Sequence, residues 1–322
     1  MTEHVATRGI VLSEGFAGLE AQAAGLAERA GLLFEKRRMV ARAPWRWVPA
    51  SRWLWPLGAV EGIGALEAGD ADGPVLLTVG GMGGAVGAAL RRRGHRVVQI
   101  QNPRMRLDGY DLVVANTHDR ISGPNVLVSR TALHRITPAV LAEARERWQG
   151  RLEALPRPLV AVLVGGANGR FRFGAGEAAE LAASLAAMMR RDRVGVALTP
   201  SRRTGDAQRA VLREALEPAG AFVWAMEGEN PYLGLLACAD AVVVTGDSVS
   251  MVSEAAATAV PVSVVTLPGR SRRIGAFLRT MIDAGRVRPF NGRHEDWTVS
   301  PLDDTGAVSA EMCRRLGLPG PS

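Results

Sequence analysis

Short apolar runs alternate along the chain with longer amphipathic stretches, from near the first residue to near the last. The clearest apolar runs contain Val, Leu and Ala but no charged residue, and they cover Pro74–Val79, Leu112–Ala115, Leu159–Val164 and Ala241–Val244. Such runs are typical of strands that are buried on both faces of a parallel sheet. The stretches between them have the composition and period of helices. This alternation predicts an α/β protein in which helices cover both faces of parallel sheets.

The alternation of strands and helices restarts after Pro156-Arg157-Pro158, where two prolines impose extended backbone. We therefore place a domain boundary near Pro156 and predict two Rossmann-like domains, residues 1–155 and 156–322. The carboxyl ends of their strands are expected to face a shared cleft. The last helix, about Gly306 to Leu316, lies in the second range but can pack back on the first domain.

Residues 240–265 carry most of the predicted chemistry. The strand Ala241–Val244 runs into Thr245-Gly246-Asp247-Ser248, and a helix over Val249–Ala259 follows with Glu254 inside it. A turn of this kind places free N–H groups and the positive end of a helix dipole at one point, which suits a phosphate. Glu254 then lies within reach of a ribose diol. The alternative is a capped helix with a solvated acid.

Two further loops in this half follow predicted strands. Gly165-Gly166-Ala167-Asn168-Gly169 follows Leu159–Val164, and Pro200-Ser201-Arg202-Arg203-Thr204 follows Val194–Leu198. Ligand sites of α/β proteins lie at the carboxyl ends of parallel strands. Convergence of three such loops at one edge favours phosphate binding over simple helix capping.

The first half contains a Gly-rich turn and a His-Asp pair. Gly80–Gly84 follows a strand, but Val86 stands where a dinucleotide fingerprint has its third glycine, and Gln101-Asn102 stands where its acid would be. An NAD site is therefore not predicted. His118-Asp119 follows the strand Leu112–Ala115, and it is either a catalytic base with its orienting acid or a structural pair.

The segment Lys36–Val60 has an unusual composition. It contains six basic residues, no acidic residue and four of the seven tryptophans, Trp45, Trp47, Trp53 and Trp55. Tryptophan beside arginine is typical of a surface that meets an anionic amphiphile or a membrane interface. The alternative is a loop that packs its indoles on the domain.

Composition narrows the class of protein. The 322 residues are 47% hydrophobic and carry a formal charge of +7, but Lys36 is the only lysine beside 38 arginines, which indicates a compositional bias. The arginines are scattered among acids, so nucleic acid is not predicted as a partner. Cys238 and Cys313 lack metal-ligand spacing, and neither a signal peptide nor a membrane-spanning run is recognised. A cytoplasmic protein without a bound metal is expected, with the option of peripheral membrane attachment.

Several motifs together resemble one family. They are Ser201-Arg202-Arg203-Thr204, Asn230-Pro231-Tyr232, the stretch from Thr245 to Ala255, and His118-Asp119 before Gly123-Pro124-Asn125. The combination is similar to the plant elongated-mitochondria fission-factor family and its bacterial homologues. The two-domain pattern resembles GT-B glycosyltransferases. Gly165-Gly166-Ala167-Asn168 and Ser253-Glu254-Ala255 match the diphosphate and ribose motifs of the GlcNAc transferase of peptidoglycan synthesis.

These resemblances imply a nucleotide-diphosphate-sugar as donor substrate, no separate cofactor, and metal-independent glycosyl transfer, with His118 and Asp119 as catalytic candidates. The alternatives are a nucleotide-sugar epimerase and a non-catalytic, GT-B-shaped adaptor. Base, sugar, acceptor, stereochemistry and oligomeric state are not predicted. The residues expected to bind the donor are Gly165, Gly166, Asn168, Ser201, Arg202, Arg203, Thr204, Asn230, Tyr232, Thr245, Asp247, Ser248, Ser250, Ser253, Glu254 and Arg273.

Overall fold

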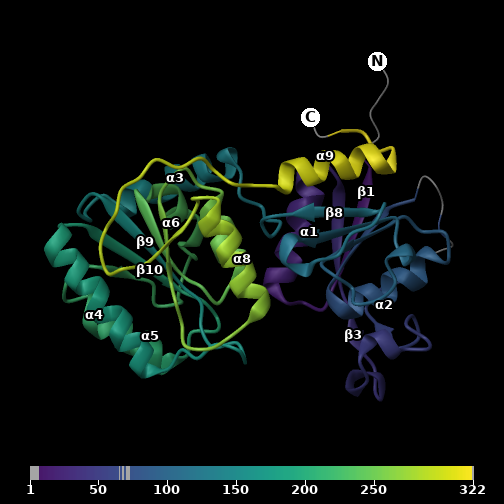
Figure 1. Cartoon of the computed structure of the whole chain (residues 1–322), viewed down its shortest axis with the longest axis horizontal. Helices are drawn as coiled ribbons and strands as arrows, with labels where there is room; N and C mark the ends of the chain where they lie inside the picture. The colour runs from purple at the N-terminus through teal and green to yellow at the C-terminus, as the bar shows by residue number, and fades with distance from the viewer. Residues whose placement is uncertain (1–6, 65, 67–68, 70–72, 321–322) are drawn as a thin grey trace. The chain divides into compact units, whose positions relative to one another are not determined.

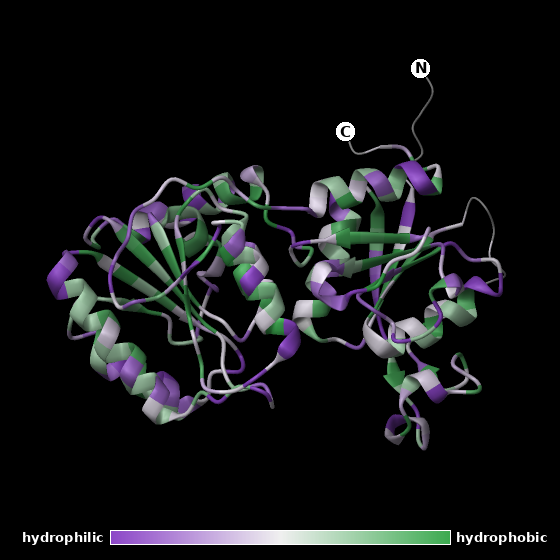
Figure 2. Ribbon diagram, in the orientation of Figure 1, coloured by the Kyte–Doolittle hydropathy of each residue, from purple (hydrophilic) through white to green (hydrophobic). Residues whose placement is uncertain are grey.

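The computed structural model describes residues 7–64, 66, 69 and 73–320, and the chain divides into two compact α/β units. Unit 1 is Met1–Arg135 with Asp304–Ser322, and unit 2 is Ile136–Asp303. Most strands of the two parallel sheets are coloured as hydrophobic along most of their length (Figure 2). The predicted α/β class with parallel sheets is confirmed.

Unit 1 is built on a six-stranded parallel sheet in the order β2-β1-β5-β6-β7-β8 (Figure 1). One face is covered by α1 (Ala17–Arg29) and α9 (Thr305–Leu316), and the other by α2 (Gly80–Arg91). The strands are β1 (Arg8–Ser13), β2 (Leu33–Arg38), β5 (Val75–Val79), β6 (Val97–Ile100), β7 (Leu112–Asn116) and β8 (Val126–Ser129).

Unit 2 repeats this plan with a sheet in the order β11-β10-β9-β12-β13-β14. Its strands are β9 (Leu159–Val164), β10 (Gly195–Pro200), β11 (Phe222–Val223), β12 (Ala241–Thr245), β13 (Val262–Val265) and β14 (Arg288–Pro289). One face is covered by α3 (Pro138–Leu152), α6 (Tyr232–Cys238), α7 (Val249–Ala256) and α8 (Arg272–Asp283), and the other by α4 (Ala175–Asp192) and α5 (Asp206–Leu216).

Helix α3 belongs to unit 2, although it precedes the proline junction at which the sequence pattern restarts. It packs against α6, and its Trp148 and Leu152 lie in the core cluster of that face. Gly234 of α6 makes this close approach feasible, since a Cβ there would lie 2.1 Å from Trp148 Cγ. The division between the units therefore follows helix packing and not the position of the prolines.

The segment expected to meet an anionic amphiphile is partly regular structure. Its first residues, Lys36 to Arg38, belong to β2, and the remainder lies between the short antiparallel strands β3 (Val40–Ala41) and β4 (Val60–Glu61). Two 3₁₀ turns, Trp45–Trp47 and Ala50–Arg52, fill that interval. Within the described residues, none of the helices combines the length and apolar character needed to cross a bilayer.

Candidate functional site

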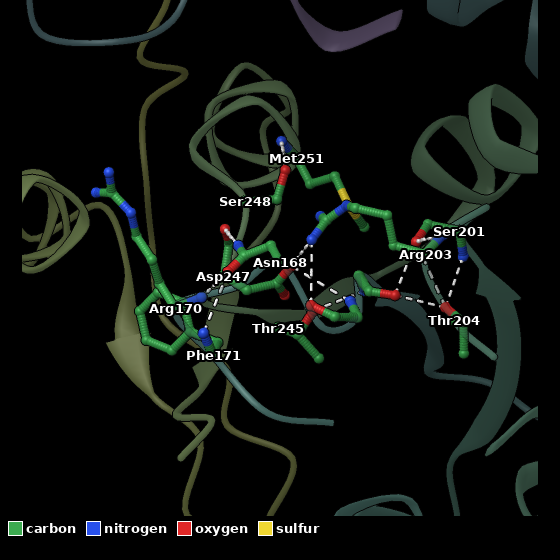
Figure 3. A network of polar contacts seen from close by, with 12 residues as sticks. Asn168, Arg170, Phe171, Ser201, Arg203, Thr204, Thr245, Asp247, Ser248 and Met251 are labelled. Atoms are coloured by element: carbon green, nitrogen blue, oxygen red, sulfur yellow. Dashed lines mark hydrogen bonds and ion pairs between the residues drawn. The ribbon is translucent and has the colours of Figure 1, made fainter. Parts of the chain in front are cut away.

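Three loops meet at one edge of the unit 2 sheet because their strands are neighbours. Strands β10, β9 and β12 lie side by side, so their carboxyl ends bring Ser201–Thr204, Gly165–Gly169 and Thr245–Ser250 together (Figure 3). Gly165 N donates to Thr245 Oγ1 at 2.7 Å, across 80 residues of sequence. The parallel register thus joins loops that are far apart in the chain.

Asp247 is the centre of this network. Its side chain is fully buried, and Oδ2 accepts from Arg203 Nη1 at 2.6 Å and from Gly166 N at 3.2 Å. Asn168 Nδ2 donates to the Asp247 carbonyl at 3.0 Å. Oδ1 is buried and has no hydrogen-bond partner within the part of the chain that the structure describes. The charge of this buried carboxylate is therefore compensated by the Arg203 guanidinium group.

Two glycines allow the loops to approach one another. A Cβ on Gly165 would lie 2.3 Å from Asp247 Oδ1, and a Cβ on Gly166 would lie 2.2 Å from the Arg203 carbonyl oxygen. Any larger residue at either position would separate the loops. The glycines therefore serve loop-to-loop packing, whatever else they allow a ligand to do.

The hydroxyl groups of the loop Ser201–Thr204 form hydrogen bonds to the neighbouring loop Gly165–Gly169. Ser201 Oγ and Thr204 Oγ1 both donate to the Gly165 carbonyl, at 2.7 and 2.5 Å. Arg203 Nη1 also donates to the Gly166 carbonyl at 3.1 Å. Arg202 lies exposed on the same turn. Arg202 and Arg203 are the charged residues of this loop, and both are exposed to solvent.

The third loop leads into α7. Ser248 is the N-cap, and its Oγ accepts from Met251 N at 3.4 Å. Ser250 is half-buried in the first turn, whereas Ser253 is fully buried and faces the interior. Arg273 is half-buried in the first turn of α8. Ser253 is thus, like Thr204, a predicted residue that packing removes from solvent.

Glu254 of α7 and Tyr232 of α6 form a pair. The Tyr232 hydroxyl donates to Glu254 Oε2, and Asn230 Oδ1 accepts from Tyr232 N at 2.9 Å at the start of α6. Burial raises the pKa of Glu254 to about 7, although the Tyr232 hydrogen bond acts in the opposite direction. Burial, together with the nearby carboxylate, raises the pKa of Tyr232. Glu254 therefore changes charge near neutral pH.

The His118-Asp119 pair of unit 1 follows β7, as predicted, but the two side chains are not hydrogen-bonded. His118 Nε2 lies 3.9 Å from Asp119 Oδ1, and its side chain is fully buried. Asp119 Oδ2 accepts instead from Asn116 N at 3.2 Å and closes the turn. The carboxylate thus shapes the backbone, and the expected hydrogen-bonded orientation of the imidazole is absent from this pair.

Sequence reasoning did not select Glu14, which follows β1. Its side chain is half-buried, and Oε1 accepts from Met82 N, in the first turn of α2, at 3.3 Å. Burial raises the pKa of Glu14 despite this hydrogen bond. The available signal in the sequence was an acid directly after a buried strand. Over the residues described, no cluster of three or more His, Cys, Asp or Glu residues could hold a metal ion.

Comparisons with known proteins point to one family and one fold. A family model described as mitochondrial fission ELM1 matches residues 17–316. The mitochondrial fission protein ELM1 of Arabidopsis thaliana is 31% identical over 280 residues, which is 77% of this chain. The chain spans 65% of the length of that relative.

Two solved structures share the fold. The UDP-GlcNAc 2-epimerase from Methanocaldococcus jannaschii has a TM-score of 0.56 and 12% identity, over 97% of this chain and 99% of that one. A UDP-glucosyltransferase from Polygonum tinctorium has a TM-score of 0.52 and 13% identity, over 97% and 89%. At such identities the likeness concerns the fold, which is GT-B.

Proposed function

The chain belongs to the mitochondrial fission ELM1 family, as its motifs predicted, and on that premise we propose that unit 2 binds a nucleotide-diphosphate-sugar. The observation that carries the proposal is the junction of three strand ends around Asp247, with a helix N-terminus at the same edge. Two proteins of this fold, an epimerase and a glucosyltransferase, are named for UDP-sugars.

The charges around Asp247 indicate how a diphosphate would be held. Asp247 neutralises Arg203, so the pair adds no net charge to the site. The phosphates would then depend on the N–H groups and dipole of the first turn of α7, and on Arg202 and Arg273. Arg203 uses its Nη1 atom for the hydrogen bonds to Gly166 and Asp247. The other N–H groups of its guanidinium could donate to a phosphate.

Glu254 is the proposed partner of the ribose. An ionised carboxylate can accept from both hydroxyls of a ribose diol, and Tyr232 already holds one of its oxygens in place. The half-burial of both side chains leaves the pair accessible to a ligand while reducing competition from water. Nucleoside recognition would therefore strengthen as Glu254 loses its proton.

The activity proposed for the whole protein is metal-independent glycosyl transfer. A general base must come within hydrogen-bonding distance of the acceptor hydroxyl. His118 would have to leave its buried position to do so, whereas Glu14 is half-buried and has a raised pKa. Glu14 is accordingly a second candidate for the base, beside His118.

The buried imidazole also favours one other function. A GT-B-shaped protein that binds a nucleotide-sugar without turnover needs no accessible base, and a relative is named as a fission protein and not as an enzyme. In that case the ligand would stabilise one conformation of an adaptor.

Ligand titration by calorimetry and thermal shift tests the binding proposal. UDP and UDP-GlcNAc should raise the unfolding temperature more than UMP does, because a ligand of the native state stabilises it by mass action. Glu254→Gln should weaken UDP binding about tenfold, the effect of losing one charge-assisted hydrogen bond. Arg213→Ala, an exposed residue of α5, serves as the control. Equal responses to every nucleotide, or none, would reject the donor site.

Product analysis then separates the functions. Release of UDP that requires an acceptor identifies a transferase, interconversion of the sugar without an acceptor identifies an epimerase, and binding without either identifies an adaptor. In a transferase, Glu14→Gln or His118→Asn should abolish turnover while sparing UDP affinity. Full activity in both variants would remove both residues from the mechanism.

A further inference from the structure

The chain from β3 to β4, residues 40–61, forms a projection on unit 1, whereas the proposed nucleotide site lies on unit 2. We call it the β3–β4 projection. It extends from unit 1 next to α2 (Figure 1), and its second 3₁₀ turn contacts that helix. It contains four tryptophans and three arginines, and its only acid is Glu61.

Two of the four tryptophans hold the projection together. Trp53 is 8% exposed, and its Nε1 donates to the Val48 carbonyl at 2.9 Å. The Trp45 ring meets it edge to face, with 6.4 Å between centroids. Trp53 also belongs to the core cluster that contains the apolar side of α2. The projection is therefore a packed element with a defined surface.

The other two tryptophans face outward. Trp47 is 69% exposed, Trp55 77% and Leu54 91%. None of the three belongs to the core cluster that contains Trp53. Large apolar side chains gathered on one exposed element mark an interaction surface.

The arginines of the projection are available to an external anion. Arg46 lies over the Trp47 ring, 4.2 Å from its centroid, and Arg52 is exposed. Neither has an acidic partner among the residues that the structure describes. The Arg42 guanidinium lies 3.9 Å from the Glu61 carboxylate, at the limit of an ion pair. By contrast, Lys36 and Arg37 of β2 pair with Glu20 and Glu35, so their charges are already compensated.

We propose that the β3–β4 projection docks on the surface of an anionic lipid bilayer. Trp47, Leu54 and Trp55 would enter the interface between headgroups and acyl chains, where indole rings are favoured. Arg42, Arg46 and Arg52 would contact the lipid phosphates. Complementary charge selects the lipid surface over a protein groove, because an apolar groove would leave the three guanidinium groups without partners.

Flotation of the whole protein with vesicles tests this proposal. The protein should float with phosphatidylcholine vesicles that contain phosphatidylglycerol and much less with phosphatidylcholine alone. Raising the salt concentration should release it, since the attraction of basic residues to anionic headgroups is screened. Inorganic phosphate at matched ionic strength should not compete, which distinguishes a lipid surface from a free-phosphate site.

Variants locate the contact. The double change Trp47→Ala and Trp55→Ala should lower partitioning more than about tenfold without shifting the unfolding temperature, because both rings are exposed. Arg46→Gln and Arg52→Gln should each lower it about fivefold at low salt. Ile282→Ala, on α8 of unit 2, removes an exposed apolar side chain elsewhere and should have no effect.

The opposite pattern would overturn the proposal. Absence of flotation with anionic vesicles, equal flotation with neutral vesicles, or undiminished flotation of the Trp47/Trp55 variant would each do so. Trp53→Ala gives the comparison for a buried indole, and it should lower the unfolding temperature. If Trp47→Ala and Trp55→Ala destabilise the fold as Trp53→Ala does, the outward rings are structural and the lipid surface is excluded.

Discussion

Some residues contribute both to the stability of the fold and to the proposed ligand site. In Glu254 these two roles oppose each other. Its carboxyl group is costly to ionise where it lies, since burial raises its pKa to about 7, yet ribose recognition requires the ionised form. The Tyr232 hydroxyl offsets part of this cost. Stability is thus lowered at the position where binding is proposed.

Glu254→Gln should separate stability from binding. Glu254 holds its proton more tightly in the folded protein than at its ordinary pKa of 4.5, so the native state loses stability as the pH rises from there to about 7. The loss is on the order of 3 kcal/mol at most. The glutamine variant avoids it and keeps an acceptor for Tyr232.

Thermal unfolding across pH provides the measurement. Above pH 7 the glutamine variant should unfold at a higher temperature than the wild type, and the difference should vanish near pH 4.5. The same variant should bind UDP more weakly. A lower unfolding temperature for the variant above pH 7 would mean that ionised Glu254 stabilises the fold, contrary to its burial.

At the scale of elements, the contact between α3 and α6 decides which unit α3 joins. Trp148 of α3 fills the space that Gly234 leaves on α6, and Arg151 stacks on the same indole ring, 4.5 Å from its centroid. Arg151 Nη1 also pairs with Glu229 Oε2 at 2.8 Å, just before α6. Packing and charge therefore attach α3 to the unit 2 sheet.

Gly234→Ala should lower the free energy of unfolding by about 1–3 kcal/mol, because the new methyl group overlaps the indole of Trp148. Gly150→Ala is the matched control on the partner helix. A Cβ at Gly150 meets no atom within 4 Å, so this change should be neutral or raise stability by about 0.5–1 kcal/mol through helix propensity. Urea denaturation compares them, and equal effects would refute the packing argument.

At the scale of the whole molecule, the chain passes from unit 1 into unit 2 and returns. Unit 1 is completed by α9, which packs on α1 and contributes Val308 and Met312 to its core. Asp304 accepts from Arg130 N at 2.6 Å at the point of return. Unit 2 is thus a continuous segment with its own two-sided core.

Residues 136–303 should fold when expressed alone, with one cooperative thermal transition, and should retain any UDP binding of the whole chain. The segment 156–322 should not, because it lacks α3, which contributes Trp148 and Leu152 to the core of unit 2, and carries α9 without α1. Circular dichroism and calorimetry compare the two fragments. A folded 156–322 fragment beside an unfolded 136–303 fragment would place the boundary at the prolines instead.

The sequence alone determined the α/β class, the parallel sheets and the junction of three loops at the ends of β9, β10 and β12. These features follow from local causes: an uncharged apolar run must be buried, and neighbouring parallel strands end at a common edge. These motifs, combined with Asn230-Pro231-Tyr232 and His118-Asp119, also predicted the family, which the comparisons confirmed.

Only the tertiary structure decided what each side chain does. Asp247 accepts a hydrogen bond from Arg203, and the Ser201 and Thr204 hydroxyls donate to the Gly165 carbonyl. The side chain of His118 is buried. No local sequence pattern specifies these partners. Composition likewise could not say that Trp53 packs inward while Trp55 faces solvent, although one residue separates them. Periodicity records which segments must be buried, whereas the choice of partners depends on the distances that folding creates between residues far apart in the chain.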